Sequence, residues 1–170
     1  LLASGDRLFV LGYLNPYQTE GPIEGRSIVV NHRDGITEWV DLEGPLAEML
    51  PLRTFEVPEE AWGLVIASKG RRGSNHAFRI DGGRVVELEG WRDRRFLDVS
   101  FIPGDRRFLV LAGSGRSEDE ASPERFEILI GGTDEPDLLS SVMSLADVVP
   151  RCLAVFDGYV FLGTDDGRIL

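Results

Sequence analysis

Apolar strand-length runs recur along the chain about every 50 residues, and this repeat constrains the fold more than any other feature. Each repeat reads as an apolar strand, a loop, a second apolar strand, a Gly/Asp turn and a third strand. The clearest runs are Arg7–Gly12, Leu64–Ser68, Arg107–Gly113 and Tyr159–Thr164. Short, almost continuous apolar runs bounded by turn residues are typical of buried β-strands.

The third repeat shows the pattern best. Its predicted strands are Phe96–Ile102, Arg107–Gly113, Arg125–Ile130 and a short outer strand at Asp137–Ser141. The first two are joined by the tight turn Pro103–Arg106, and we expect Arg107–Gly113 to be buried on both faces. Four strands joined in this order make an antiparallel meander of about 45 residues, which is the size of one β-propeller blade.

The other repeats follow the same plan with variable loops. The predicted strands are Arg7–Leu14, Arg26–His32 and Ile36–Leu42; Arg53–Val57, Trp62–Ser68, Asn75–Ile80 and Arg84–Glu89; and Arg151–Phe156 and Tyr159–Thr164. The first repeat lacks an opening strand, and the last stops inside its third. Two stretches have helical alternatives: Pro45–Leu50, and Leu138–Val149, whose apolar residues also fit a helix-like stripe.

The predicted fold class is therefore all-β. We expect one β-propeller segment over residues 1–170 with three to four four-stranded antiparallel blades, the first and last of them incomplete. The blades fall at about 6–42, 53–89, 95–141 and 151–170. The chain begins with Leu1 and stops after a turn, so we expect it to be part of a longer protein.

Two stretches resemble blades of known propeller families. Residues Leu97–Gly113 resemble the first two strands of a blade in the WD-repeat (WD40-like) and related propeller superfamilies, and Phe156–Leu170 is similar to a blade of NHL-type and quinoprotein-like propellers. The likeness covers most of the chain as a pattern. It departs from the strict WD-repeat family, because the Gly-His and Trp-Asp signature does not occur, and the quinoprotein tryptophan-docking pattern does not recur.

The charge and hydrophobic content of the chain limit the classes of binding partner that we expect. With 18 Lys and Arg against 29 Asp and Glu, the net charge is −11, which disfavours nucleic acid and anionic membranes as partners. Hydrophobic residues make up 42% of the chain, so a packed core is expected and disorder is not. We expect a protein partner, or other domains of the same chain. No secretory signal or membrane-spanning run is recognised, and a cytoplasmic location is favoured.

Propeller geometry predicts one binding face. The second and fourth strands of a blade run in the same direction, so the long loops that follow them share one face, and function concentrates in long loops on rigid scaffolds. Arginine and lysine there suit carboxylate or phosphate groups, and exposed tyrosines suit protein contacts. The candidate binding residues are Lys69, Arg71, Arg72, Arg92, Arg94, Arg95, Tyr13 and Tyr17, with the acidic loop Glu118–Glu120 nearby. Solvated loop charge is the plain alternative.

Few residues are candidates for catalysis or for binding a metal or cofactor. Cys152 lies in an apolar run and is predicted to be a small buried core residue, and His32 and His76 are predicted to be structural. The segment Ala112–Ser117 is glycine-rich but lacks the lysine of a phosphate-binding loop. Carboxylates cluster in turns at Asp134, Glu135 and Asp137, and at Asp165 and Asp166, where turn formation explains them better than Ca²⁺ binding. We therefore predict no catalytic residue, no metal ligand and no cofactor.

Three functions fit these features. The first is a non-enzymatic protein-interaction or scaffold module that presents long loops on one propeller face. The alternative is part of a metal-dependent hydrolase propeller resembling phytases, lactonases or esterase-like enzymes, with Ca²⁺ as its cofactor and a site completed by further blades. That alternative depends on fold analogy alone. The third is a purely architectural spacer.

Overall fold

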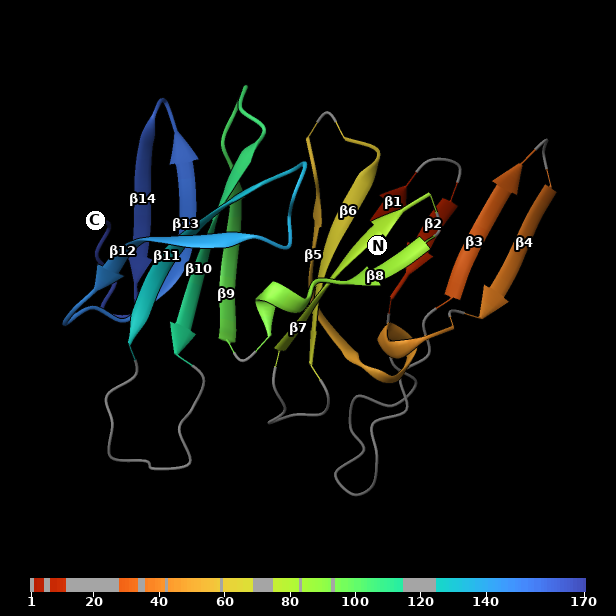
Figure 1. Cartoon of the computed structure of the whole chain (residues 1–170), viewed down its shortest axis with the longest axis horizontal. Helices are drawn as coiled ribbons and strands as arrows, with labels where there is room; N and C mark the ends of the chain where they lie inside the picture. Colours follow the sequence, from red (N-terminus) through yellow and green to blue (C-terminus); the bar gives the residue numbers. More distant parts are fainter. Residues whose placement is uncertain are drawn as a thin grey trace, which may run out of the picture. The chain divides into compact units, whose positions relative to one another are not determined.

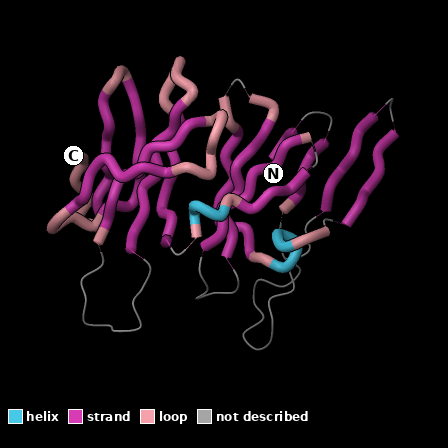
Figure 2. The backbone as a smooth tube through the Cα atoms, in the orientation of Figure 1, coloured by secondary structure: helices cyan, strands magenta, loops and turns pink. Residues whose placement is uncertain are grey.

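The protein is an all-β structure of antiparallel meanders (Figures 1 and 2). The computed structural model describes residues 2–4, 7–11, 28–33, 36–41, 43–58, 60–68, 75–82, 84–92, 94–114 and 125–170. In the strands before residue 42, side chains are described only for Phe9. Two units divide the chain, Leu1–Glu89 and Gly90–Leu170, and each is described by itself.

The N-terminal unit holds two four-stranded sheets. The first has the order β1-β2-β3-β4, formed by Leu2–Ser4, Arg7–Val10, Ile28–Arg33 and Ile36–Asp41. A single 3-10 turn, η1 (Pro45–Glu48), leads to the second sheet. That sheet has the order β5-β6-β7-β8, formed by Leu50–Glu56, Trp62–Ser68, Asn75–Asp81 and Arg84–Glu87. Every neighbouring pair is antiparallel, as consecutive meanders require.

The two sheets of this unit share an apolar core. Phe9 from β2 is completely buried and packs with Leu46 and Met49 around η1, and with side chains of β6 and β7 that include Val65 and Phe78. The opening strand β1 lies beside β5 and β6. Burial of these side chains joins the two meanders, because each sheet alone would leave one apolar face in water.

The C-terminal unit begins inside another 3-10 turn, η2 (Glu89–Trp91), and continues with a third four-stranded sheet. Its order is β12-β11-β10-β9, formed by Leu139–Leu145, Phe126–Gly132, Arg107–Ser114 and Arg94–Phe101. Pro150–Phe156 and Tyr159–Thr164 form the antiparallel pair β13-β14. Asp157 and Gly158 at its turn both have positive φ, 49° and 77°. This matches a two-residue turn of the kind that follows the right-handed twist of a hairpin.

Side chains of β9 hold β13 in place. The buried carboxylate of Asp98 accepts hydrogen bonds from the backbone N–H groups of Val99 (3.1 Å) and Leu153 (2.9 Å). The hydroxyl of Ser100 accepts a third, from the N–H of Val155 (3.1 Å). Leu109, Leu111, Ile128, Leu153 and Leu162 form the apolar core beside these bonds. The first strands of two successive sheets are thus joined by side-chain acceptors as well as by apolar contact.

Most predicted strands are confirmed, with shifts of a few residues at their ends. Trp62–Ser68 and Tyr159–Thr164 are strands with the predicted bounds. The whole of β6 is buried, and so is β10 from Phe108 to Gly113, as expected for Arg107–Gly113. The stretch Pro45–Leu50 contains the short turn η1 before β5 begins.

One expectation was wrong, and one alternative that the sequence left open is decided. The first repeat does have an opening strand: β1 spans only three residues, too few for a periodic pattern to reveal, and it pairs with β2. The stretch Leu138–Val149 is not helical, because Leu139–Leu145 pairs with β11 as strand β12. Backbone pairing along β11 decides this conformation, and the apolar positions Val142 and Met143 are more than half exposed.

Replacing Asp98 by alanine is expected to destabilise the C-terminal unit. The change leaves the backbone N–H groups of Leu153 and Val99 without their acceptor inside the protein, which costs about 2 kcal/mol of unfolding free energy. Urea unfolding followed by circular dichroism measures this. The control is Asp134→Ala, whose exposed ion pair with Arg106 contributes about 0.5 kcal/mol or less. Equal stability of the two variants would contradict the role assigned to Asp98.

Candidate functional site

The candidate site in the described residues is one end of the sheet β9–β12. Antiparallel register sets Arg94 opposite Ser114 and Arg95 opposite Gly113, so both arginines lie where β10 ends. Gly113 also pairs with Phe126, so Arg125, directly before β11, lies at this same end. We call Arg92, Arg94, Arg95 and Arg125 the arginine end.

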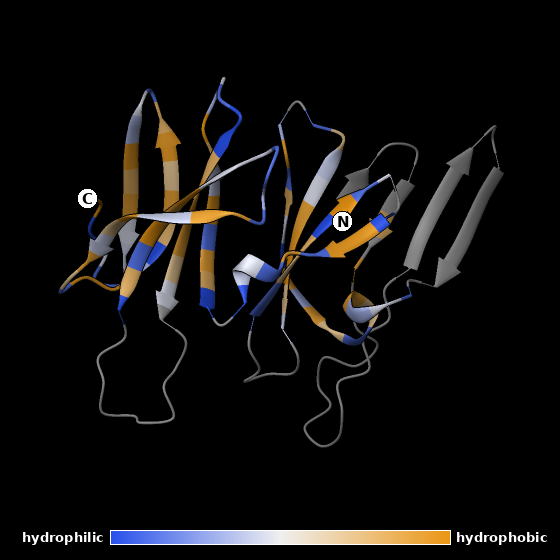
Figure 3. Cartoon of the chain, viewed as in Figure 1, coloured by the Kyte–Doolittle hydropathy of each residue, from blue (hydrophilic) through white to orange (hydrophobic). Residues whose placement is uncertain are grey.

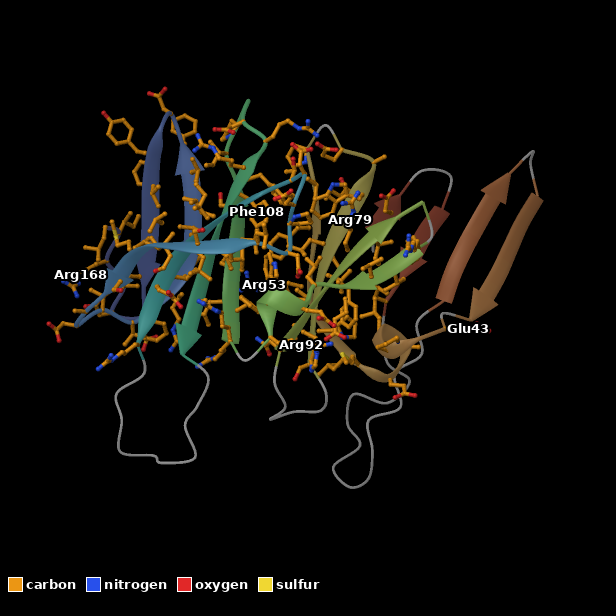
Figure 4. The ribbon with its side chains drawn as sticks, viewed as in Figure 1. Glu43, Arg53, Arg79, Arg92, Phe108 and Arg168 are labelled. Carbon is orange, nitrogen blue, oxygen red and sulfur yellow. The ribbon has the colours of Figure 1, made fainter. Side chains whose placement is uncertain are left out.

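The turn before β9 positions Arg92 (Figure 4). The neighbouring Trp91 is completely buried, packs against Phe96 and Phe108, and donates its indole N–H to the carbonyl oxygen of Pro136 at 2.6 Å. The N–H of Gly90 bonds the Asp137 carboxylate at 2.8 Å. A side chain at position 90 would meet the Asp137 carbonyl oxygen at 2.0 Å, so glycine is required here. This anchor fixes where the chain carrying Arg92 and Arg94 enters the sheet.

The four arginines differ in their surroundings. Arg94 is half-buried and forms an ion pair with Glu127 on β11. Arg92, Arg95 and Arg125 are exposed. The Glu127 carboxylate offsets the charge of the Arg94 guanidinium, and the side chains of the other three arginines are exposed to solvent. Arginine is suited to binding an anionic group, because its planar fork donates two parallel hydrogen bonds to a carboxylate or phosphate.

The predicted binding residues are thus only partly covered by the structure. Arg92, Arg94 and Arg95 lie together at the arginine end. Lys69, Arg71, Arg72, Tyr13 and Tyr17 lie outside the described residues, as does the acidic loop Glu118–Glu120. Sequence reasoning missed Arg125. The available signal was its place at the start of a predicted strand, since that start must face the end of the preceding antiparallel strand.

Cys152 is exposed, so its prediction as a buried core residue was wrong. Side chains alternate along β13, and it is Leu153 that points into the apolar core while Cys152 points the other way. Its sulfur lies over Gly163 on β14, where an added side chain would come within 2.5 Å of it.

His76 on β7 contacts an acidic side chain and an aromatic ring. Its Nδ1 lies 2.7 Å from a carboxylate oxygen of Glu87 on β8, and its ring stacks on Phe78. Both partners of this pair are about one-fifth exposed, 18% and 19%. His32 is in β3, and its side chain lies outside the described ones.

Three of the five turn carboxylates form ion pairs with arginines. Asp134 pairs with Arg106, Asp165 with Arg151, and Asp166 with Arg168. The Thr164 hydroxyl and then the Arg168 guanidinium lower the pKa of Asp166 below its ordinary value of 3.8. A hydrogen bond from Arg107 likewise lowers the pKa of Asp105. In the part of the chain that the structure describes, no group of three or more His, Cys, Asp or Glu side chains is arranged to hold a metal ion.

No protein-family model matches this chain, and no curated protein matches it. The fold itself defines the class, an all-β protein built from consecutive antiparallel meanders. Among the described residues, no helix has the length and apolar character needed to cross a membrane.

Substituting Thr164 by valine is expected to raise the pKa of Asp166 toward 3.8, because the hydroxyl is the largest contribution that lowers it. Arg168→Gln should also raise it, because the ion pair with Asp166 is lost. Since the folded-state pKa is lowered, the ionised carboxylate stabilises the fold above about pH 4, and this contribution is lost as the pH falls through the lowered pKa. Carbon-13 NMR titration of the side-chain carboxyl measures both variants, and an unchanged value in Thr164→Val would contradict the assignment.

Proposed function

We propose that this chain is a β-propeller segment that acts as a non-enzymatic protein-interaction or scaffold module. Its described binding surface is the arginine end, and its partner is an acidic or phosphorylated segment of another protein or of another domain. The observation that carries the proposal is the register of β9, β10 and β11, which gathers arginines from two separate stretches of sequence at one end of a sheet.

Local charge supports an acidic partner. The whole chain carries a net charge of −11, so an acidic segment is repelled at long range except where basic groups gather. Arg92, Arg95 and Arg125 are exposed on a sheet anchored by the buried Trp91. A rigid anchor keeps the guanidinium groups together, which lowers the entropy lost when a partner binds.

The stacking of sheets supports the propeller interpretation. Inside each unit the sheets follow one another along the chain, and the first strand of one lies near the first strand of the next, as β1 does with β5 and β9 with β13. Four-stranded meanders arranged with their first strands as neighbours are the plan of a propeller, whose first strands surround the central axis.

Charge reversal at the arginine end tests the binding surface. We expect the triple variant Arg92→Glu, Arg95→Glu and Arg125→Glu to bind a fluorescent octaglutamate peptide at least tenfold more weakly than the unaltered chain, a loss of about 1.4 kcal/mol. Fluorescence anisotropy at low and physiological salt measures the affinity, and salt should weaken binding to the unaltered chain.

The matched control is Arg84→Glu on β8, an exposed arginine of the other unit, which should change the affinity less than twofold. Circular dichroism establishes that each variant is folded. If the triple variant binds the peptide as tightly as the unaltered chain, the arginine end is not the docking surface.

A further inference from the structure

The two-stranded sheet β13-β14 has one apolar face that is open to solvent. Cross-strand register pairs Cys152 with Gly163, Ala154 with Phe161, and Phe156 with Tyr159, which sets these residues on the face opposite Leu153 and Leu162. Ile169, paired with Gly163, joins them. We call Cys152, Ala154, Phe156, Tyr159, Phe161 and Ile169 the outer face.

The outer face exposes large hydrophobic side chains. Phe156 is 72% exposed, Tyr159 68%, Phe161 39% and Ile169 76%. Colouring by hydropathy shows the apolar character along β13 and β14 (Figure 3). Contiguous exposed apolar surface of this kind marks an interaction site more often than scattered surface hydrophobics do.

The second strands of two of the four-stranded sheets are more deeply buried than β14. β6 and β10 are apolar runs, and their side chains are buried on both faces from Trp62 to Ser68 and from Phe108 to Gly113. β14 is also the second strand of its sheet and is also apolar on both faces. On its inner face Leu162 is 6% exposed and Val160 42%, and on its outer face Tyr159 is 68% and Phe161 39% exposed, so β14 lacks part of the cover that β6 and β10 have. The sequence of β14 is thus suited to burial between two layers.

We propose that a further antiparallel β-sheet packs on the outer face, stacked on β13-β14 as β13-β14 is stacked on β9–β12. It continues an interface already present in this unit, in which the first strands β9 and β13 lie side by side. At that junction Asp98 and Ser100 accept N–H groups of β13. The outward side chains of β13 are Cys152, Ala154 and Phe156, which have no oxygen acceptor. The covering sheet therefore presents aliphatic or aromatic side chains and is held by apolar contact.

Area disfavours a second copy of this chain as the occupant. The exposed parts of the three aromatic side chains and Ile169 add up to on the order of 500 Å². Two copies meeting through this face alone would fall short of the about 800 Å² per partner that stable interfaces bury.

The only cysteine in the chain reports on this surface, since Cys152 is exposed on the outer face. The experiment measures the rate at which a maleimide labels Cys152 in two samples. One is the native protein, isolated without denaturation from the cells that naturally produce it, and the other is the purified 170-residue chain. We expect labelling in the isolated native protein to be at least tenfold slower. Equal rates would overturn the proposal. A rate in the purified chain that falls as its concentration rises would also overturn it, because a second copy would then be the occupant.

Substitutions on the outer face test whether slow labelling of Cys152 is caused by a covering sheet or by something else. The double variant Phe156→Ser and Tyr159→Ser, expressed in the same cells, should restore fast labelling of Cys152, because both side chains are exposed here and their contact with the covering sheet is lost. The control Val142→Ser and Met143→Ser alters two exposed apolar residues of β12 and should keep labelling slow. Protection that survives the outer-face variant contradicts the proposal. Neither outcome depends on the arginine end.

Discussion

The buried carboxylate of Asp98 is the polar contact on which the C-terminal unit depends. Burying a carboxylate is costly unless hydrogen-bond donors surround it, and Asp98 receives two from the backbone, one in its own strand and one in β13. The bond from Leu153 satisfies an N–H group on the side of β13 that does not pair with β14. Sheet stacking in this unit is therefore directional, since apolar contact alone would allow the sheets to slide.

The two candidate surfaces of this unit have different physical character. The arginine end is charged, lies at the end of β10 and is positioned by the buried Trp91. The outer face is apolar and lies on β13-β14. Charged groups at a rim guide association and select partners, whereas apolar faces supply the free energy of lasting contact. In the scaffold function that we propose, the arginine end binds a docking segment and the outer face packs against a neighbouring sheet.

The candidate site shows how far sequence reasoning reaches. Arg92, Arg94 and Arg95 are adjacent in sequence, so their clustering was predictable. Arg125 comes from the far side of a long loop, and only the pairing of Gly113 with Phe126 sets it beside them. The pairing of Arg94 with Glu127 was equally hidden, because it depends on which side chains of two strands share one face.

The sequence by itself determined the strands, because alternation, apolar runs and Gly/Asp turns are local signals. It therefore predicted β6 and β14 with their bounds and the burial of β10 on both faces. Tertiary structure alone decided three things: the pairing of the three-residue β1, the strand conformation of Leu139–Leu145 and the exposure of Cys152. Each depends on which neighbouring strand or sheet covers a given edge or face, and the chain's local pattern does not carry that information.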